Sequence, residues 1–470
     1  MIKRAILSVS DKTGITQLAR RLADRGVTLL STGGTMKAIA DAGIPVTGVS
    51  DVTGFPECLD GRVKTLHPMI HAGLLAVRDN PEHMKQLEQL GVEPIDMVVI
   101  NLYPFRATIE KPDVTFEDAV ENIDIGGPTM LRAAAKNAQD VVVIIDPADY
   151  DRVMDELEQT GDVSLKTKRY LQYKVFEHTA QYDCMIQQYL RGQLEDAPEF
   201  PQNLTVTFEK VQDMRYGENP HQKAAFYRDL GDIAGTLPAA KQLHGKELSY
   251  NNINDTNGAL ELLREFDTTA VVAVKHGNPC GVGVANEVSE AYRLAYEADP
   301  VSVFGGIVVT NGTVDAATAE QMSKIFLEII VAPKFTDEAM AILTKKKNLR
   351  LLELDTTIRS YPKNEMVMRK VAGGMLVQEI DDKLLPEDGE LKVVTKLAPT
   401  EKQMEDLMLA WKIVKHAKSN GIAIAKDNQS LGIGPGQVNR IWSTQMAIER
   451  SGEKVRGAAL ASDAFFPFDD

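Results

Sequence analysis

Short apolar runs alternate with amphipathic stretches along the first 150 residues, and this pattern predicts an α/β fold. The strand-like runs are RAILSVS (4–10), VTLLST (27–32), IPVTGVS (44–50), DMVVINLYPF (96–105) and DVVVIID (140–146). Residues 14–26 and 35–43 instead carry their apolar side chains at helical spacing. Strands without polar alternation, separated by helices, indicate a parallel sheet that is covered on both faces.

The second half of the chain again mixes strand-like and helical patterns after a break near residue 200. A long polar helical stretch covers 165–190, and the segment APEFPQN (197–203) carries two prolines typical of a linker. We therefore expect domains at 1–197 and 203–470. Strand-like runs return at 269–277, 305–312, 348–354 and 421–427, and there is no short tandem repeat.

Composition indicates a soluble, globular, cytoplasmic protein. The chain has 470 residues, of which 44% are hydrophobic and 25% charged. No apolar run approaches the roughly 18 residues that a membrane span needs, and the N-terminus lacks a secretory apolar region. The three cysteines are too few for a disulfide framework. A net charge of −15 argues against a general nucleic-acid binder.

Two loops in the first half are candidates for anion binding. SVSDKTG (8–14) and STGGT (31–35) both lie where a strand gives way to a helix. Each supplies hydroxyl groups, backbone N–H groups and a helix N-terminus, which together suit a phosphate. One such loop alone is more typical of ordinary helix capping. Two at consecutive ends of parallel strands favour a ligand site.

Further polar side chains in the first half have both structural and functional interpretations. Arg62, Lys64, His67 and His71 crowd the otherwise apolar segment 54–76. A zinc site is not expected there, because the segment has neither an HExxH pattern nor a third ligand. Tyr103 in NLYPF, Asp124 before a Gly-Gly turn and Lys136 in NIDIGGPTMLRAAAKN (122–137) could each be structural.

The stretch KHGNPCGVG (275–283) places Lys275 and His276 where an apolar run ends. Histidine followed by Pro-Cys resembles the zinc deaminases, whose pattern is HxE and then PCxxC. Here Asn278 replaces the glutamate and Gly283 replaces the second cysteine, so the stretch has too few ligands for a zinc ion. A Lys–His pair suited to proton transfer at neutral pH remains. Arg215 is a further candidate, as a phosphate-binding fork.

These motifs closely resemble one family of bifunctional purine-biosynthesis enzymes. SVSDKTG, STGGT, DGRVKTLHPMIHAGLL, NLYPF and ENIDIGGPTMLRAAAKN resemble its IMP cyclohydrolase domain. RYGENPHQ, LSYNNIND, VKHGNPCGVG, DPVSVFGGI and SDAFFPF resemble its aminoimidazole carboxamide ribonucleotide (AICAR) transformylase domain. The resemblance implies an N-terminal α/β domain similar to methylglyoxal synthase and a C-terminal, duplicated, cytidine-deaminase-like α/β domain without zinc. It also implies a homodimer.

The resemblance further implies two consecutive reactions. A formyl group passes from 10-formyltetrahydrofolate to AICAR, and the formylated product then loses water to close the ring of IMP; neither step requires a metal. The implied catalytic residues are Lys275 and His276 for formyl transfer, and Lys64, Tyr103, Asp124 and Lys136 for ring closure. The implied nucleotide-binding residues are Ser10, Lys12, Thr13, Ser31, Gly33, Gly34, Thr35, Arg62 and Thr65 in the first half, and Arg215, Tyr216, Gly305, Asn420 and Arg440 in the second. Phe468 and Asp470 match positions on the folate side.

Two alternatives stay open at this stage. Family members usually continue past the SDAFFPF motif, whereas this chain ends at Asp470. In one alternative only the cyclohydrolase works, and the second half is a binding or dimerisation module. The other alternative is a zinc-dependent deaminase, which His276 and Cys280 alone would support.

Overall fold

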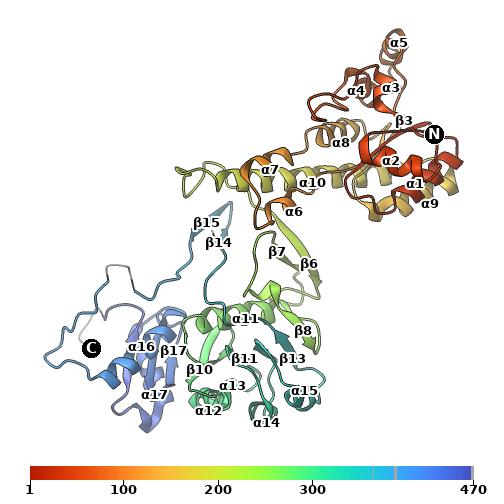
Figure 1. Cartoon of the computed structure of the whole chain (residues 1–470). Helices are drawn as coiled ribbons and strands as arrows, with labels where there is room; N and C mark the ends of the chain where they lie inside the picture. The colour runs from red at the N-terminus through yellow and green to blue at the C-terminus, as the bar shows by residue number, and fades with distance from the viewer. Residues whose placement is uncertain (364, 386–388, 467–470) are drawn as a thin grey trace. The chain divides into compact units, whose positions relative to one another are not determined.

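The computed structural model describes residues 1–363, 365–385 and 389–466, and it divides into two compact units, Met1–Thr207 and Phe208–Asp470 (Figure 1). Phe468 and Asp470 lie outside the described residues. Within the described ranges, no helix is both long and apolar enough to cross a membrane.

The first unit contains a parallel sheet with the strand order β3-β2-β1-β4-β5. Its strands are β1 (Arg4–Val9), β2 (Thr28–Ser31), β3 (Thr47–Gly48), β4 (Met97–Asn101) and β5 (Val142–Ile144). Consecutive residues of the central strands, such as Ile6 and Leu7, are fully buried. Because successive side chains point to opposite faces, both faces of this sheet must be covered. The parallel sheet predicted from the sequence is confirmed.

The first unit also contains helices, several of which pack on this sheet. They are α1 (Ile15–Asp24), α2 (Gly33–Asp41), α3 (Val49–Thr53), α4 (Pro68–Leu75), α5 (Pro81–Leu90), α6 (Phe105–Ile109), α7 (Phe116–Glu121), α8 (Gly126–Lys136), the 3-10 helix η1 (Pro147–Asp149), α9 (Tyr150–Thr160) and α10 (Leu165–Arg191). The strand predicted at 44–50 is mostly wrong, since β3 is short and α3 begins at Val49. The carboxylate of Asp51 accepts a hydrogen bond from the Gly48 N–H at 3.2 Å, which favours a helix start there.

The second unit contains a mixed sheet with the order β18-β16-β17-β10-β9-β11-β12-β13-β8 and two separate hairpins, β6–β7 and β14–β15. Its strands are β6 (Phe208–Met214), β7 (Ala224–Asp229), β8 (Lys241–His244), β9 (Ala270–Lys275), β10 (Asn278–Val284), β11 (Ile307–Thr310), β12 (Ile329–Ala332), β13 (Arg350–Glu353), β14 (Met366–Val371), β15 (Gly374–Glu379), β16 (Ile422–Lys426), β17 (Gln429–Gly434) and β18 (Ala459–Ser462). Its helices are α11 (Tyr250–Leu263), α12 (Val288–Ala298), α13 (Pro300–Val303), α14 (Ala316–Ser323), α15 (Asp337–Leu343), α16 (Glu401–Lys415) and α17 (Arg440–Ser451), with 3-10 helices η2 (Leu237–Ala239) and η3 (Gly452–Val455).

Strand β9 shows why the apolar runs of this unit lack polar alternation. Val272 and Val274 belong to the core formed with α11 and α16. Val271 and Ala273 point the opposite way, into the core formed with α12, α14 and α15. A strand between two such cores must be apolar at every position.

The second unit repeats one substructure, a hairpin followed by a helix. The segment β9–β10–α12 corresponds to β16–β17–α17, and in both the second strand packs closely against the helix (Figure 1). A β-carbon at Gly281 would lie 2.0 Å from the Ala295 carbonyl oxygen, and one at Gly432 would lie 2.1 Å from the Ala447 oxygen. Glycine is therefore needed at matching places in both copies, consistent with the duplication that the resemblance implies.

Candidate active sites

The carboxyl ends of β1, β2 and β4 meet at one edge of the first unit's sheet, where parallel α/β folds usually bind ligands. The loop after β1 is held by Asn101 at the end of β4. The side-chain Oδ1 of Asn101 accepts hydrogen bonds from the Ser10 and Asp11 N–H groups at 2.6 and 2.9 Å, and its Nδ2 donates to the Asp11 carbonyl at 2.9 Å. This loop therefore has a defined shape without a ligand. Asn101 was not singled out from the sequence.

The same loop is stabilised from within. The Asp11 carboxylate accepts hydrogen bonds from the backbone N–H and the hydroxyl of Thr13, at 2.9 and 2.7 Å, and these bonds lower the pKa of Asp11. Gly14 follows with a φ of 69°, a left-handed conformation that glycine adopts without strain. The Thr13 hydroxyl is thus already engaged in the turn that leads into α1.

Ser31 and Thr35 use their hydroxyl groups inside the protein. The buried Ser31 hydroxyl donates to the Leu7 carbonyl at 2.6 Å. The buried Thr35 hydroxyl donates to the Val9 carbonyl at 2.9 Å and accepts from the Val9 N–H at 3.0 Å. Ser31 thus fastens the end of β2 to β1, and Thr35 fastens the start of α2 to β1. The backbone at Gly33 and Gly34 lies between these two fixed points.

Two lysines reach the N-terminus of α2 from different loops. A β-carbon placed on Gly34 would lie 3.6 Å from Nζ of Lys12, and one on Gly33 would lie 3.8 Å from Nζ of Lys64. The positive end of the helix dipole and the two ammonium groups thus act at the same place. Lys64 also forms an ion pair with Glu57 at 3.1 Å. The arrangement suits a phosphate.

Asp124 connects the end of β4 with the start of α8. Its Oδ1 accepts from the Gly127 N–H at 2.8 Å and its Oδ2 accepts from the Tyr103 N–H at 3.4 Å. Burial raises the pKa of Asp124, although these two hydrogen bonds oppose the shift. The Tyr103 side chain is 44% exposed. The structure therefore holds the Asp124 carboxyl group against the backbone of Tyr103, whose side chain is exposed at this edge of the sheet.

Thr65 and Arg62 approach the same region from the loop before α4. A β-carbon on Gly126, the first residue of α8, would lie 2.8 Å from Oγ1 of the buried Thr65. Arg62 is exposed and forms an ion pair with Glu121, which raises the pKa of the guanidinium. Arg62 is thus already paired, whereas Thr65 packs directly beneath the Asp124 turn.

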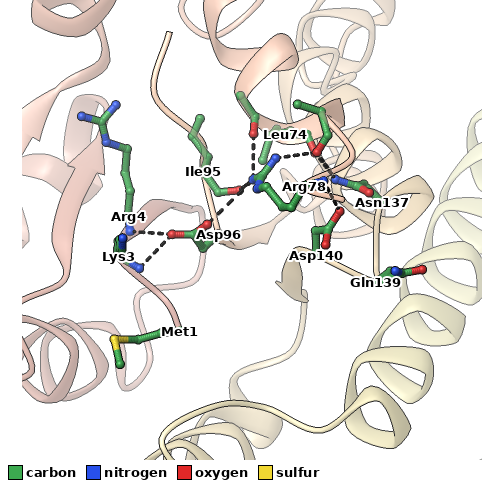
Figure 2. Close-up of polar contacts among 12 residues, drawn as sticks. Met1, Lys3, Arg4, Leu74, Arg78, Ile95, Asp96, Asn137, Gln139 and Asp140 are labelled. Carbon is green, nitrogen blue, oxygen red and sulfur yellow. Dashed lines mark hydrogen bonds and ion pairs between the residues drawn. The ribbon is translucent and has the colours of Figure 1, made fainter. Parts of the chain in front are cut away.

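Lys136 lies at the opposite end of α8 from Asp124. The rise of an α-helix places the two ends of α8 about 15 Å apart. Near Lys136 the chain is held by a separate polar network, in which Asn137 Nδ2 donates to the Leu74 carbonyl and Arg78 Nη2 donates to the Ile95 carbonyl, each at 2.9 Å (Figure 2). Within one chain, Lys136 does not join the Asp124 cluster.

Lys275 and His276 belong to a tight hairpin turn in the second unit. Strand β9 ends at Lys275 and β10 begins at Asn278, and the two residues between them, His276 and Gly277, have φ of 52° and 71°. Two consecutive left-handed residues are typical of a type I′ turn, which suits the twist of the paired strands. Lys275 Nζ donates to the Phe304 carbonyl at 2.8 Å, next to Gly305. The turn exposes His276 beside a fixed ammonium group.

Asn278 links this turn to the second copy of the repeat, in which Arg440 fixes Asn420. Asn278 Nδ2 donates to the His276 carbonyl at 3.2 Å, and its Oδ1 accepts from the Lys418 N–H at 3.3 Å. Arg440 Nη2 donates to Oδ1 of Asn420 at 2.7 Å. Its Nη1 donates to the Ser462 hydroxyl at 2.8 Å and pairs with Asp463. His276, Gly305 and Asn420 are thus brought into one region by these contacts.

The second copy of the repeat has the lysine but not the histidine. Lys426 ends β16 as Lys275 ends β9, and its Nζ donates to the Arg456 carbonyl at 3.0 Å. Its turn consists of Asp427 and Asn428, with φ of 51° and 64°. The sequences KHGNPCGVG and KDNQSLGIG share the lysine and two glycines at equal spacing. This equal spacing indicates the internal repeat, which is too divergent to be recognised as a short tandem repeat.

Arg215 and Tyr216 follow β6, and the Arg215 guanidinium lies 5.8 Å from the centre of the Tyr216 ring. The adjacent Met214 lines a cavity of about 470 Å³ together with Asn254 of α11. Asn254 Nδ2 would lie 3.8 Å from a β-carbon on Gly277. The Arg215 segment and the His276 turn therefore approach the same part of α11.

Cys280 is not arranged as a metal ligand. Burial raises the pKa of its thiol to about 12, and Sγ lies 3.4 Å from the Ala273 carbonyl oxygen. Among the described residues, no group of three or more His, Cys, Asp or Glu side chains could hold a metal ion.

Comparisons with known proteins cover the whole chain. A family model described as "AICARFT/IMPCHase bienzyme" matches residues 134–450, and one described as "MGS-like domain" matches 14–129. Proteins named bifunctional purine biosynthesis protein PurH are 62% identical in Acetivibrio thermocellus, 61% in Ruminiclostridium cellulolyticum and 57% in Bacillus cereus. Each alignment spans 100% of this chain and 91% of the relative.

Proposed function

This chain belongs to the AICARFT/IMPCHase bienzyme family, and we propose that its two units divide the two activities between them. The chain is a bifunctional enzyme, an AICAR formyltransferase that uses a folate co-substrate and an IMP cyclohydrolase. The observation that carries this conclusion is identity of 56–62% to PurH proteins over the full chain. A chain with cyclohydrolase activity alone is not favoured, because these relatives are named as bifunctional.

We assign ring closure to the first unit. The phosphate of the formylated nucleotide would bind at the N-terminus of α2 beside Lys12, where the helix dipole and the Lys12 ammonium group stabilise negative charge. The reacting carboxamide and formyl groups would then lie near Tyr103 and Asp124. The carboxamide nitrogen attacks the formyl carbon within one molecule, so a site that holds the reactive conformer supplies much of the rate.

Asp124 is suited to moving the proton in this step. The carboxamide nitrogen and the formamide nitrogen must each lose one proton, and the formyl oxygen must gain both of these protons to leave as water. Burial raises the pKa of Asp124, which makes its carboxylate a stronger base than an ordinary aspartate. The Lys64 ammonium and the exposed Tyr103 phenol are donors that could stabilise the oxygen as it acquires charge. Lys136 stays a proposed participant, and its distance from Asp124 means that it would have to act from a second copy of the chain.

We assign formyl transfer to the second unit. The AICAR amine is a weak nucleophile, because its lone pair is conjugated with the ring, so a base must remove its proton as it attacks the formyl carbonyl. His276 stands exposed at the hairpin turn and would accept that proton. The bond between the formyl carbon and the folate nitrogen then breaks, and that nitrogen takes the proton as tetrahydrofolate leaves. Lys275, fixed by the Phe304 carbonyl, would stabilise the developing negative oxygen. Arg215, Tyr216, Gly305, Asn420 and Arg440 would bind the nucleotide.

The folate co-substrate would be 10-formyltetrahydrofolate, with no metal needed in either step. A cytoplasmic homodimer is the proposed working form, supported by the family resemblance of the transformylase motifs. Phe468 and Asp470 would contribute on the folate side.

Paired assays on the 470-residue chain test this function. One assay supplies AICAR with 10-formyltetrahydrofolate, and the other supplies the already formylated nucleotide. We expect IMP from both. IMP from the formylated nucleotide alone would support a cyclohydrolase whose second unit is inactive, and IMP from neither would refute both assignments.

A further inference from the structure

Tyr182 of α10 contacts the Asp124 segment directly, although no role was assigned to it from the sequence or the comparisons. Its side chain is 4% exposed. Its hydroxyl oxygen accepts a hydrogen bond from the Asp124 N–H at 2.9 Å and donates one to the Asn122 carbonyl at 3.2 Å. One hydroxyl thus satisfies a donor and an acceptor of the turn that leads into α8.

The ring of Tyr182 also contacts the segment that carries Tyr103. It meets the ring of Phe105 edge to face, with centres 6.1 Å apart and an interplanar angle of 68°. Phe105 is buried, and its N–H donates to the Tyr103 carbonyl at 2.8 Å. Tyr182 therefore packs against both segments that supply the proposed ring-closure residues.

The ionisation of Tyr182 fits these contacts. Burial raises the pKa of its phenol to about 12, so the hydroxyl keeps its proton throughout the neutral range. A neutral hydroxyl can donate and accept at the same time, whereas a phenolate could not donate to the Asn122 carbonyl.

We propose that Tyr182 is a positioning residue for ring closure, which holds the Asp124 carboxylate in place relative to Tyr103. This inference rests on the proposed cyclohydrolase function of the first unit. Without the hydroxyl, the Asp124 N–H would lose its partner in a buried site and the turn would move. The two hydrogen bonds that Asp124 accepts, from Gly127 and Tyr103, would then lengthen. Because both bonds lower the pKa of Asp124, their loss should raise it further.

The test uses Tyr182→Phe in the full chain, with Tyr189→Phe as a matched control. Tyr189 lies on the same helix and also meets Phe105 edge to face, with centres 5.7 Å apart. Within the described ranges its hydroxyl forms no hydrogen bond. For Tyr182→Phe we expect kcat of ring closure to fall roughly tenfold to a hundredfold, with KM changed less than about twofold, because a misplaced catalytic group mainly affects the chemical step. The acid limb of the pH profile should move to higher pH. Tyr189→Phe should behave like the parent, and both variants should retain formyl transfer.

Several outcomes would overturn the proposal. One is a folded Tyr182→Phe variant with the parental kcat and pH profile. A second is an equal loss of kcat in Tyr189→Phe. A third is a lower kcat in Tyr182→Phe without any movement of the acid limb of its pH profile. If Tyr182→Phe does not fold, hydrogen exchange of the Asp124 backbone amide in the parent protein tests the contact instead. The hydrogen bond predicts slow exchange of the Asp124 amide, and exchange as fast as in an unfolded peptide would refute it. If the parent itself does not close the ring, the proposed function fails rather than the role of Tyr182.

Discussion

Replacing Gly127 by alanine should disable ring closure while leaving the fold nearly intact. Gly127 is buried in the first turn of α8 and donates its N–H to Asp124. A β-carbon there would lie 2.7 Å from Oδ2 of Asp124 and 2.7 Å from Cδ2 of Leu102. Carbon atoms in contact normally keep about 3.5–4.0 Å apart. To restore a normal contact distance, the Asp124 carboxylate, the Leu102 side chain or both must therefore move by up to about 1 Å.

The expected cost in stability is small because two effects oppose each other. Alanine in place of glycine favours a helix by about 1 kcal/mol. Overpacking a close contact costs about 1–3 kcal/mol. The net loss is then about 0–2 kcal/mol, which corresponds to at most roughly 8 °C in the melting temperature of a unit of this size. Catalysis should suffer more, since a displacement of about 1 Å can cost roughly a hundredfold in rate.

The assay measures kcat for ring closure of the formylated nucleotide, formyl transfer and thermal unfolding for each variant. Gly258→Ala is the matched control, because Gly258 is also a helical glycine but a β-carbon there would meet nothing closer than 3.9 Å. Gly127→Ala should lose ring closure alone, and Gly258→Ala should keep it. Parental ring closure by Gly127→Ala would refute the placement of Asp124 at the reacting groups. Loss of ring closure together with unfolding would show that the glycine is needed for the fold instead.

Three further predictions concern single side chains. Asp124→Asn should lower ring closure by roughly 10²–10⁴-fold, measured by single-turnover kinetics, because the base is lost. Because burial raises the pKa of Asp124, the parent should lose stability relative to Asp124→Asn as pH rises through that pKa. Calorimetry across that pH range checks this, and a difference in melting temperature that does not change with pH would contradict the burial effect. Arg440→Lys should lower kcat/KM for formyl transfer roughly 10- to 100-fold, because one ammonium cannot replace the guanidinium fork that reaches Asn420, and an unchanged value would remove Arg440 from the site. Lys275→Ala should reduce formyl transfer roughly 10²–10³-fold, whereas Lys426→Ala, which loses the equivalent bond to a carbonyl, should not; equal loss in steady-state assays would make the lysine structural.

Much of the first unit could be predicted from the sequence, because its strands are continuous apolar runs with few alternatives. Strands and helices at β1, α1, β2 and α2 lie within a few residues of the predicted ranges. The run 44–50 was harder, since Asp51, just beyond it, favours a helix start through a hydrogen bond to Gly48 that spacing alone does not reveal. The hairpin at His276 is encoded locally, because the apolar run predicts a strand that ends near Lys275 and Gly277 readily adopts the left-handed conformation of the turn.

The site was less accessible to sequence reasoning, because its supporting contacts join distant segments. Tyr182 reaches Asp124 from a helix that begins about 40 residues later, and nothing in the local pattern marks that tyrosine. Ser31 and Thr35 each donate a hydrogen bond to a β1 carbonyl, which the sequence does not reveal, and their role in the nucleotide pocket stays a prediction. The position of Lys136 at the far end of α8 follows from helix geometry once the helix bounds are known. Its proposed role in ring closure stays a prediction.

The most direct test of two separate sites is the pair of assays applied to His276→Ala in the full chain. The account predicts IMP from the formylated nucleotide at the parental rate and no IMP from AICAR with 10-formyltetrahydrofolate. Loss of both activities in a folded variant, or retention of both, would contradict the division of the two reactions between the two units.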